Sequence, residues 1–208
     1  TQGGNNNGYA QDNEITWVDW SSVDHPLIEF TAALARLRKE HPTFRRSRFF
    51  DGRPVKMEEG DNIPDVVWLR PDGTLMQPED WDSGFGRAVG VFLNGQGIRE
   101  RDRRGEAISD DHFLVLFNAG DEPVDFHVPD LEYSPEWDVY VDTAGERANT
   151  EPILPGEALQ LEPKSLIVLR EHHLPEPEID HTVAASLTAQ IAITATDDLP
   201  GQAPKPEL

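Results

Sequence analysis

The residues best suited to chemistry in this sequence stand together in its opening segment, TQGGNNNGYAQDNEITWVDW. The segment brings together side-chain amides, a phenol and a carboxylate, namely Asn5, Asn6, Asn7, Tyr9, Gln11 and Asp12. Each amide both donates and accepts hydrogen bonds, the carboxylate accepts them, and the phenol adds an aromatic face. This set suits the hydroxyl groups and the apolar face of a sugar. A second interpretation stays open, because asparagine-rich loops often form turns and hold their own shape.

Two carboxylates in this segment, Asp12 and Glu14, raise the possibility of glycosidase chemistry. Retaining glycosidases use two carboxyl groups about 5–5.5 Å apart. A segment this rich in amides favours a loop, because its side chains compete with the backbone for hydrogen bonds. A loop does not hold two carboxylates in a fixed geometry. We therefore assign no catalytic residue to this chain.

A helix is predicted after the loop, over residues 24–40. Asp24 is a suitable N-cap, and Pro26 stands in the first turn, where its missing N–H costs nothing. Pro42 ends the helix. One apolar stripe recurs at helical spacing, made of Leu27, Phe30, Leu34 and Leu37.

The hydrophobic period changes after residue 49. Short runs rich in β-branched and aromatic residues cover 65–70, 87–95, 112–120, 124–128, 137–143, 158–161 and 165–171. Runs of this length and spacing predict a mainly β fold, an antiparallel β-sandwich. The stretch NAGDEP at 118–123 is predicted to be a tight hairpin. The alternating pattern of 187–195 could add one strand.

Three stretches together resemble one known family. In chain order they are the opening segment, RLRKEHPTFRRSRFF (36–50), and VVWLRPDG (66–73) with WDSGFGRAVGVFLNG (81–95). They resemble the isoamylase-type glycogen debranching enzymes of the α-amylase superfamily, family 13 of the glycoside hydrolases. The similarity extends from Thr1 to about Glu171.

The resemblance implies a truncated chain with three regions. Residues 1–48 would be the C-terminal remnant of a (β/α)8 catalytic barrel, with the loop after strand eight and the final helix. Residues 49–171 would be the C-terminal β-sandwich. Residues 172–208 would be an acidic, proline-containing tail, largely disordered. The family's catalytic carboxylates lie on earlier barrel strands and loops, so this chain alone is expected to be inactive.

The function implied by the resemblance is a part of an enzyme. The parent protein would hydrolyse α-1,6-glucosidic branch linkages in glycogen or related glucans by retaining double displacement. The expected partner is an α-glucan, namely glycogen, limit dextrin or malto-oligosaccharide, and the opening loop would bind it. The alternative is a non-catalytic sandwich module that stabilises a barrel or binds glucan. The stripe of helix 24–40 could also support self-association.

Composition narrows the other possibilities. The formal charge of −21 argues against nucleic acid as a partner. No apolar run approaches the roughly 20 residues that span a bilayer, so no membrane partner is expected. The absence of cysteine and of a signal-like start favours the cytoplasm. We expect no cofactor and no metal.

Three further groups of side chains have two interpretations each. Basic residues gather after the middle of the helix, at Arg36, Arg38, Lys39, Arg45, Arg46 and Arg48. They are predicted to cover the barrel–sandwich boundary and to pair with acids such as Glu40 or Asp51, with a nucleic-acid patch as the alternative. Histidines 172, 173 and 181 could bind a metal, although adjacent tail histidines are usually only exposed. Tryptophans 68, 81 and 137 could form a starch-binding platform, but a tryptophan within a strand, such as Trp68, is expected in the core.

Overall fold

The structure is a computed structural model, and it describes residues 12–14, 16–55, 62–82, 86–145 and 151–173. The chain divides into two units, Thr1–His172 and His173–Leu208, and the description below concerns the first. The possible strand at 187–195 and the predicted disorder of the tail fall outside the described residues.

The predicted helix is confirmed as α1 (His25–Glu40). The side chain of Asp24 accepts a hydrogen bond from the N–H of Leu27 at 3.0 Å, as expected of an N-cap. A short 3-10 turn, η2 (Trp20–Ser22), precedes the helix. A second, η3 (Pro42–Arg45), follows it directly, because Pro42 cannot continue the helix.

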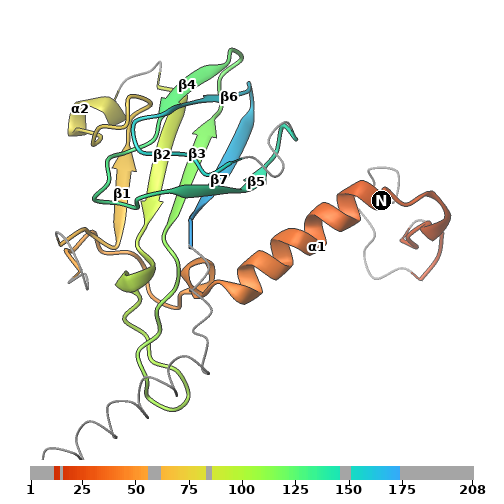
Figure 1. Ribbon diagram of the computed structural model, residues 1–208. Helices are drawn as coiled ribbons and strands as arrows, with labels where there is room; N and C mark the ends of the chain where they lie inside the picture. Colours follow the sequence, from red (N-terminus) through yellow and green to blue (C-terminus); the bar gives the residue numbers. More distant parts are fainter. Residues whose placement is uncertain (1–11, 15, 56–61, 83–85, 146–150, 174–208) are drawn as a thin grey trace, which may run out of the picture. The chain divides into compact units, whose positions relative to one another are not determined.

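Every predicted run contains a strand in the described part of the chain. The strands are β1 (Val66–Leu69), β2 (Ala88–Leu93), β3 (Phe113–Asn118), β4 (Val124–His127), β5 (Trp137–Asp142), β6 (Ala158–Leu161) and β7 (Ser165–Glu171). One sheet has the order β1-β2-β3-β7-β5, and the other pairs β4 with β6. All these pairings are antiparallel, which confirms the predicted fold class (Figure 1).

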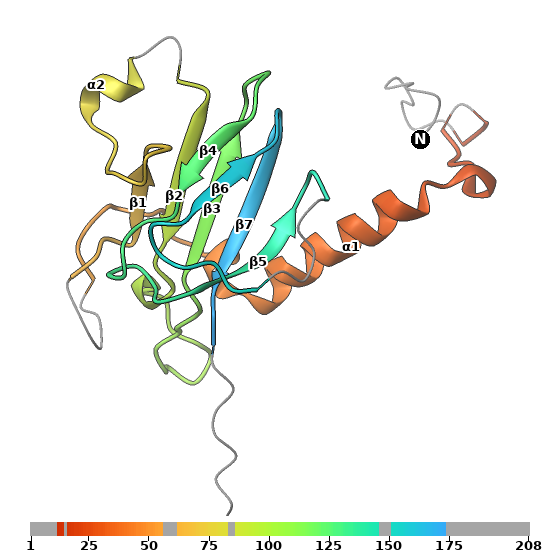
Figure 2. The ribbon, with the colours of Figure 1, turned by 45° about the horizontal axis from the view of Figure 1, so that its top comes forward.

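The main core lies between the two sheets, and β4 and β6 cross one face of the larger sheet (Figure 2). Phe126 and Leu159 from the small sheet pack with Leu69, Phe92 and other residues of the large one. A second apolar cluster occupies the opposite face of the large sheet, around Phe113, where Phe44 from η3 covers it. Strand β3 is therefore buried on both faces, which explains its almost continuous apolar run.

The predicted hairpin at 118–123 is wrong. Strand β3 pairs with β2 and β7, whereas β4 pairs with β6, so the turn carries the chain from one sheet to the other. Asn118 fixes this crossing, because its buried amide donates to the carbonyls of Glu122, Leu161 and Glu162 at 2.8–3.2 Å. Turn residues mark where a strand ends, but they do not say which sheet the next strand joins.

The expectation for Trp68 is also wrong. Trp137 is fully buried in the core, whereas Trp68 in β1 is 42% exposed. Strand β1 is the edge of the larger sheet, and Trp68 alternates with the buried Val67 and Leu69. Its side chain therefore points away from the core.

Candidate functional site

Of the opening segment's proposed sugar-binding residues, only Asp12 is among the described residues. Asn5, Asn6, Asn7, Tyr9 and Gln11 lie outside them. Asp12 is exposed, and its Oδ1 accepts a hydrogen bond from the indole N–H of Trp17 at 2.7 Å. This bond orients the carboxylate. Glu14, the second carboxylate of the pair considered above, is exposed as well.

The segment after α1 is bound to the sandwich through a shared carboxylate. Asp110, just before β3, has Oδ1 at 2.8 Å from His41 Nδ1, and its Oδ2 accepts the N–H of Thr43 at 2.8 Å. The Asp110 side chain is only 6% exposed. The ring of His41 also meets the edge of Phe113 at 4.8 Å between centroids. The end of α1 is therefore held by both polar and apolar contacts.

A buried ion pair holds the next turn of this segment. Arg46 donates to Asp65 Oδ2 at 3.2 Å and to the carbonyl of Gly97 at 3.1 Å. Its guanidinium carbon lies 4.1 Å from the ring centroid of Phe50. The Arg46 and Asp65 side chains are 4% and 1% exposed, so losing either would leave a buried charge without its partner.

A third carboxylate, Glu100, also binds the segment that follows α1. Its Oε1 accepts the backbone N–H groups of Ser47 and Arg48, each at 2.9 Å. Burial raises the pKa of Glu100, but the hydrogen bonds from Arg48 and Ser47 outweigh it, so the pKa is lowered overall. We call the contacts of residues 41–48 with Asp65, Glu100 and Asp110 the junction.

The predicted partners of the basic cluster were wrong in detail. The acid that pairs with Arg46 is Asp65, and Asp51 pairs instead with Arg99, at 2.7 Å, and with Arg53. Sequence reasoning missed Asp65, Glu100 and Asp110, because each lies far along the chain from its partner. The only local signal was the HPTFRR stretch itself.

Among the described residues, one group has the ligand types of a metal site. Ligand atoms of His41, Asp110 and Asp111 lie within 4.8 Å of one another. Asp110 already accepts hydrogen bonds from Thr43 and from the N–H of Asp111. The hydrogen bonds of the junction therefore explain why these three side chains lie close together, without a metal ion. Of the other histidines considered, His172 has Nδ1 at 2.8 Å from Asp138 Oδ1, and His181 is outside the described residues.

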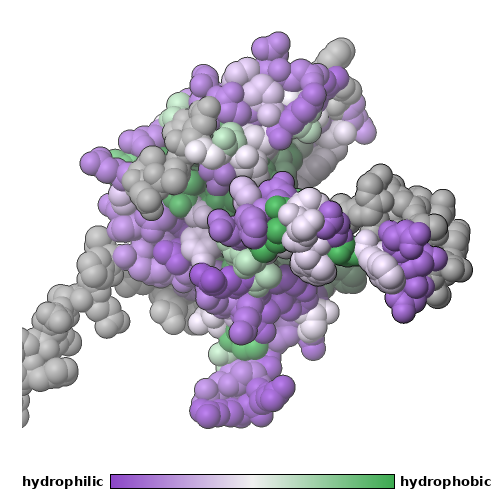
Figure 3. All heavy atoms as spheres, turned by 90° about the vertical axis from the view of Figure 1, so that its right-hand side faces the viewer, coloured by the Kyte–Doolittle hydropathy of each residue, from purple (hydrophilic) through white to green (hydrophobic). Residues whose placement is uncertain are grey.

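The apolar stripe of α1 is mostly uncovered. Leu37 is buried next to η3, but the side chains further toward the start of the helix are exposed, namely Leu27, Ile28, Phe30 and Leu34. Apolar surface interrupts the polar surface on this side of the molecule (Figure 3). An exposed stripe of this kind marks a surface that another part or partner covers.

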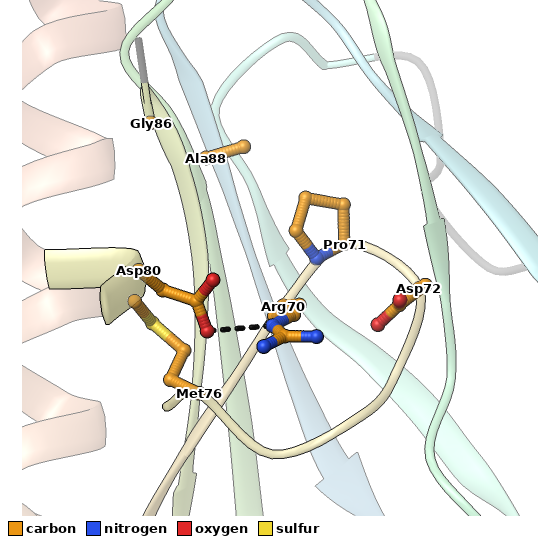
Figure 4. Close-up of a pocket in the computed structure, with 7 residues that line it drawn as sticks. All are labelled: Arg70, Pro71, Asp72, Met76, Asp80, Gly86 and Ala88. Atoms are coloured by element: carbon orange, nitrogen blue, oxygen red, sulfur yellow. Dashed lines mark hydrogen bonds and ion pairs between the residues drawn. The ribbon is translucent and has the colours of Figure 1, made fainter. Parts of the chain in front are cut away.

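A small cavity lies beside the edge strand β1, with a volume of about 330 Å³ (Figure 4). Its lining includes Arg70, Pro71, Asp72, Met76, Asp80 and Ala88. The Arg70 and Asp80 side chains point toward each other, with Nε and Oδ2 2.6 Å apart. The N–H of Gln77 and then Arg70 hold the pKa of Asp80 below its usual value.

Two tryptophans that are close in the chain to the lining residues Arg70 and Asp80 contact each other. Trp81 ends the four-residue helix α2 (Pro78–Trp81), and its ring centroid lies 5.2 Å from that of Trp68 in a T-shaped contact. Trp81 is 55% exposed. The sequence did not predict α2, although the pattern QPED offers proline in the first turn and an acid that closes a capping box.

Comparison with known proteins adds two findings. Residues 65–167 match the family model described as "Isoamylase, C-terminal". The chain is 43% identical over 174 residues to the "Glycogen operon protein GlgX homolog" of Mycobacterium tuberculosis, covering 82% of this chain and 24% of that protein. It is 36% identical over 133 residues to the "Glycogen debranching enzyme" of Cronobacter sakazakii, covering 64% of this chain and 16% of the relative.

The chain thus spans about a quarter or less of the length of these relatives. A similar match, 31% identical over 133 residues, is to the "Glycogen debranching enzyme" of Escherichia fergusonii. In the part of the chain that the structure describes, no helix is long and apolar enough to cross a membrane.

Proposed function

We propose that this chain, whose residues 65–167 match the isoamylase C-terminal family model, is the C-terminal part of a glycogen debranching enzyme. The whole protein hydrolyses α-1,6 branch linkages in glycogen or a related glucan, in the cytoplasm. The observation that carries this proposal is the 43% identity over 174 residues to the protein named "Glycogen operon protein GlgX homolog". Two relatives named glycogen debranching enzyme support it.

In this proposal, residues 1–48 complete the catalytic barrel, and residues 49–171 form the sandwich domain that stabilises it. The exposed stripe of α1 supports this, because a final barrel helix needs the rest of the barrel to cover its apolar side. The junction then transmits the position of α1 to the sandwich. Self-association through the same stripe is the other way to bury it.

The opening loop is proposed to bind the glucan. Loops at the C-terminal ends of barrel strands form the active sites of barrel enzymes. Asn5, Asn6, Asn7 and Gln11 supply donors and acceptors for sugar hydroxyls, and Tyr9 supplies an aromatic face. Asp12 is held by Trp17 through Oδ1, which leaves its second oxygen to accept from a sugar hydroxyl.

The 208-residue chain alone is proposed to have no hydrolytic activity. Double displacement needs two carboxyl groups held about 5–5.5 Å apart, whereas Asp12 and Glu14, the pair considered in the opening segment, are both exposed. The chain's own contribution is then structural and is made through the junction. This agrees with the alternative of a non-catalytic sandwich module that stabilises a barrel.

The test is a comparison of two proteins on branched and linear α-glucans. One is this chain, and the other is a version extended at its N-terminus to include a barrel. We expect release of reducing ends only from the branched glucan and only with the extended protein. Activity on linear glucan alone, or none with a folded extended protein, would overturn the proposal.

A further inference from the structure

Two exposed tryptophans, one in β1 and one in α2, contribute to neither core of the sandwich. Trp68 and Trp81 are 42% and 55% exposed, and neither belongs to the two apolar cores. In a T-shaped pair only one ring turns its face to the other, so the second ring's faces are not used by the contact. An exposed aromatic face of this kind can receive the apolar face of a ligand.

The pair is held in place by polar contacts that begin in β1. The Trp68 carbonyl accepts the N–H of Met76 at 2.9 Å, which returns the chain along the edge strand. Asp80 Oδ2 accepts both from Arg70, at 2.6 Å, and from the N–H of Gln77, at 2.7 Å. The same oxygen therefore caps α2 and fastens it to the end of β1, which places Trp81 against Trp68.

The turn between these elements is rigid as well. Asp72 accepts from the N–H and the hydroxyl of Thr74 at 3.0 and 2.6 Å. The carbonyl of Pro71 accepts the N–H of His127 at 2.7 Å, which ties the turn to β4. At Gly73, with φ of +81°, an added Cβ would lie 2.9 Å from the carbonyl oxygen of His127. The lining of the cavity in Figure 4 is thus preorganised, and the Arg70–Asp80 contact in that lining also fixes α2, which carries Trp81.

Charge selects the kind of ligand. The exposed acids of this stretch are Glu79 in α2, Asp82 at its end and Asp72 at the cavity, and Arg70 is already paired with Asp80. On a chain with formal charge −21, these exposed acids disfavour an anionic ligand or a second copy of the chain. The exposed apolar side chains are also few, namely Trp68, Leu75 and Trp81, whereas a stable protein interface uses about 20–30 residues on each side.

From this geometry we infer that Trp68, Trp81 and the adjoining Arg70–Asp80 cavity bind a neutral α-glucan chain, away from the opening loop in sequence. A sugar ring lays its apolar face on an indole, and its hydroxyls meet the guanidinium and carboxylate groups at the cavity. The choice of an α-glucan rests on the proposed function. The site would hold a glucan on the sandwich while another segment is cleaved.

The test uses this chain and measures binding of maltoheptaose by calorimetry and of glycogen by retardation in native gels. Trp81→Ala and Trp68→Ala should each weaken maltoheptaose binding roughly five- to tenfold. Phe49→Ala, which removes an aromatic side chain that is 97% exposed and lies outside both the opening segment and the two cores, is the matched control and should leave binding unchanged. Arg70→Gln should weaken binding with both indoles present, because it releases α2.

No binding of either glucan would overturn the inference. Equal losses in the Phe49→Ala control, or equal binding of a β-1,4-linked cello-oligosaccharide, would overturn it as well. A dimer that dissociates on Trp81→Ala would assign the pair to self-association instead and so overturn it. If Trp68→Ala fails to fold, Trp81→Ala still decides, because that side chain is in neither core. Hydrolysis by the extended protein without glucan binding by this chain would overturn this inference alone.

Discussion

His41 Nδ1 and Asp110 Oδ1 lie 2.8 Å apart, although 69 positions separate the two residues in the chain. The contact joins the end of α1 to the segment that enters β3. Because Asp110 also accepts the N–H of Thr43, one carboxylate fixes both the helix end and the start of η3. The direction in which α1 leaves the sandwich is therefore set by a group that belongs to the sandwich.

Replacing Asp110 should loosen this contact. Asp110→Ala leaves the N–H of Thr43 without its acceptor in a buried place, so we expect the free energy of unfolding to fall by about 2–3 kcal/mol. Asp121→Ala is the matched control, since it removes ion pairs with Arg87 and Lys164 that are more than 60% exposed. The control should cost less than about 1 kcal/mol. Equal losses in urea denaturation would show that the junction carries no special stability.

The start of the sandwich domain can be tested by truncation. Chains beginning at residue 49 and at residue 41 should both melt cooperatively, since the strands and their core are retained. The longer chain should have a free energy of unfolding higher by about 3 kcal/mol, which corresponds to a melting temperature higher by roughly 10 °C. It keeps Phe44 packed on the second apolar cluster, around Phe113, and it keeps Arg46 paired with the buried Asp65. The melting temperatures of the two chains are compared by calorimetry. Identical values would show that residues 41–48 do not stabilise the sandwich domain and that the domain begins after them.

Alkaline pH should destabilise the sandwich through ionisation of Tyr133. Burial raises the pKa of this phenol from 10.0 to about 12, with Glu132 adding to the shift. Because the folded-state pKa is above the unfolded value, the stabilisation is complete below pH 10 and is lost as pH rises toward 12. Wild type should lose about 2–3 kcal/mol relative to Tyr133→Phe over this window. Near pH 7 the two should differ little, and parallel pH profiles would contradict the expectation.

The proposed sugar contact of Tyr9 can be measured in a protein that includes the barrel. Tyr9→Ala should lower kcat/KM on a branched glucan roughly tenfold, which corresponds to about 1–2 kcal/mol of transition-state binding. The melting temperature of the sandwich should not change, because the proposed contact of Tyr9 is with the glucan and not with the sandwich. An unchanged kcat/KM would remove Tyr9 from the binding site.

The sequence alone predicted the elements well and their long-range partners poorly. Helix α1 and the seven strands follow from local periodicity, which a single segment carries in itself. The exposure of Trp68 depends on β1 being a sheet edge, and the crossing at Asn118 depends on which sheet β4 joins. Both are properties of the topology, which local patterns do not specify.

The same distinction applies to the candidate sites. The HPTFRR stretch was recognisable, but its acceptors Asp65, Glu100 and Asp110 are found only when the chain is folded. The Arg70–Asp80 pair spans ten residues and also needed α2, a four-residue helix too short to show a periodic pattern. The residues of the opening loop could be named from the sequence, whereas their geometry could not.

The central claim, that this chain completes a debranching enzyme, is tested most directly by an exchange of segments. The matching segment of the Cronobacter sakazakii relative is replaced by this chain, and reducing-end release from glycogen is compared with that of the same relative lacking the segment. We predict that the hybrid debranches glycogen and that the shortened protein does not. A hybrid that melts cooperatively and yet releases nothing from glycogen would contradict the claim.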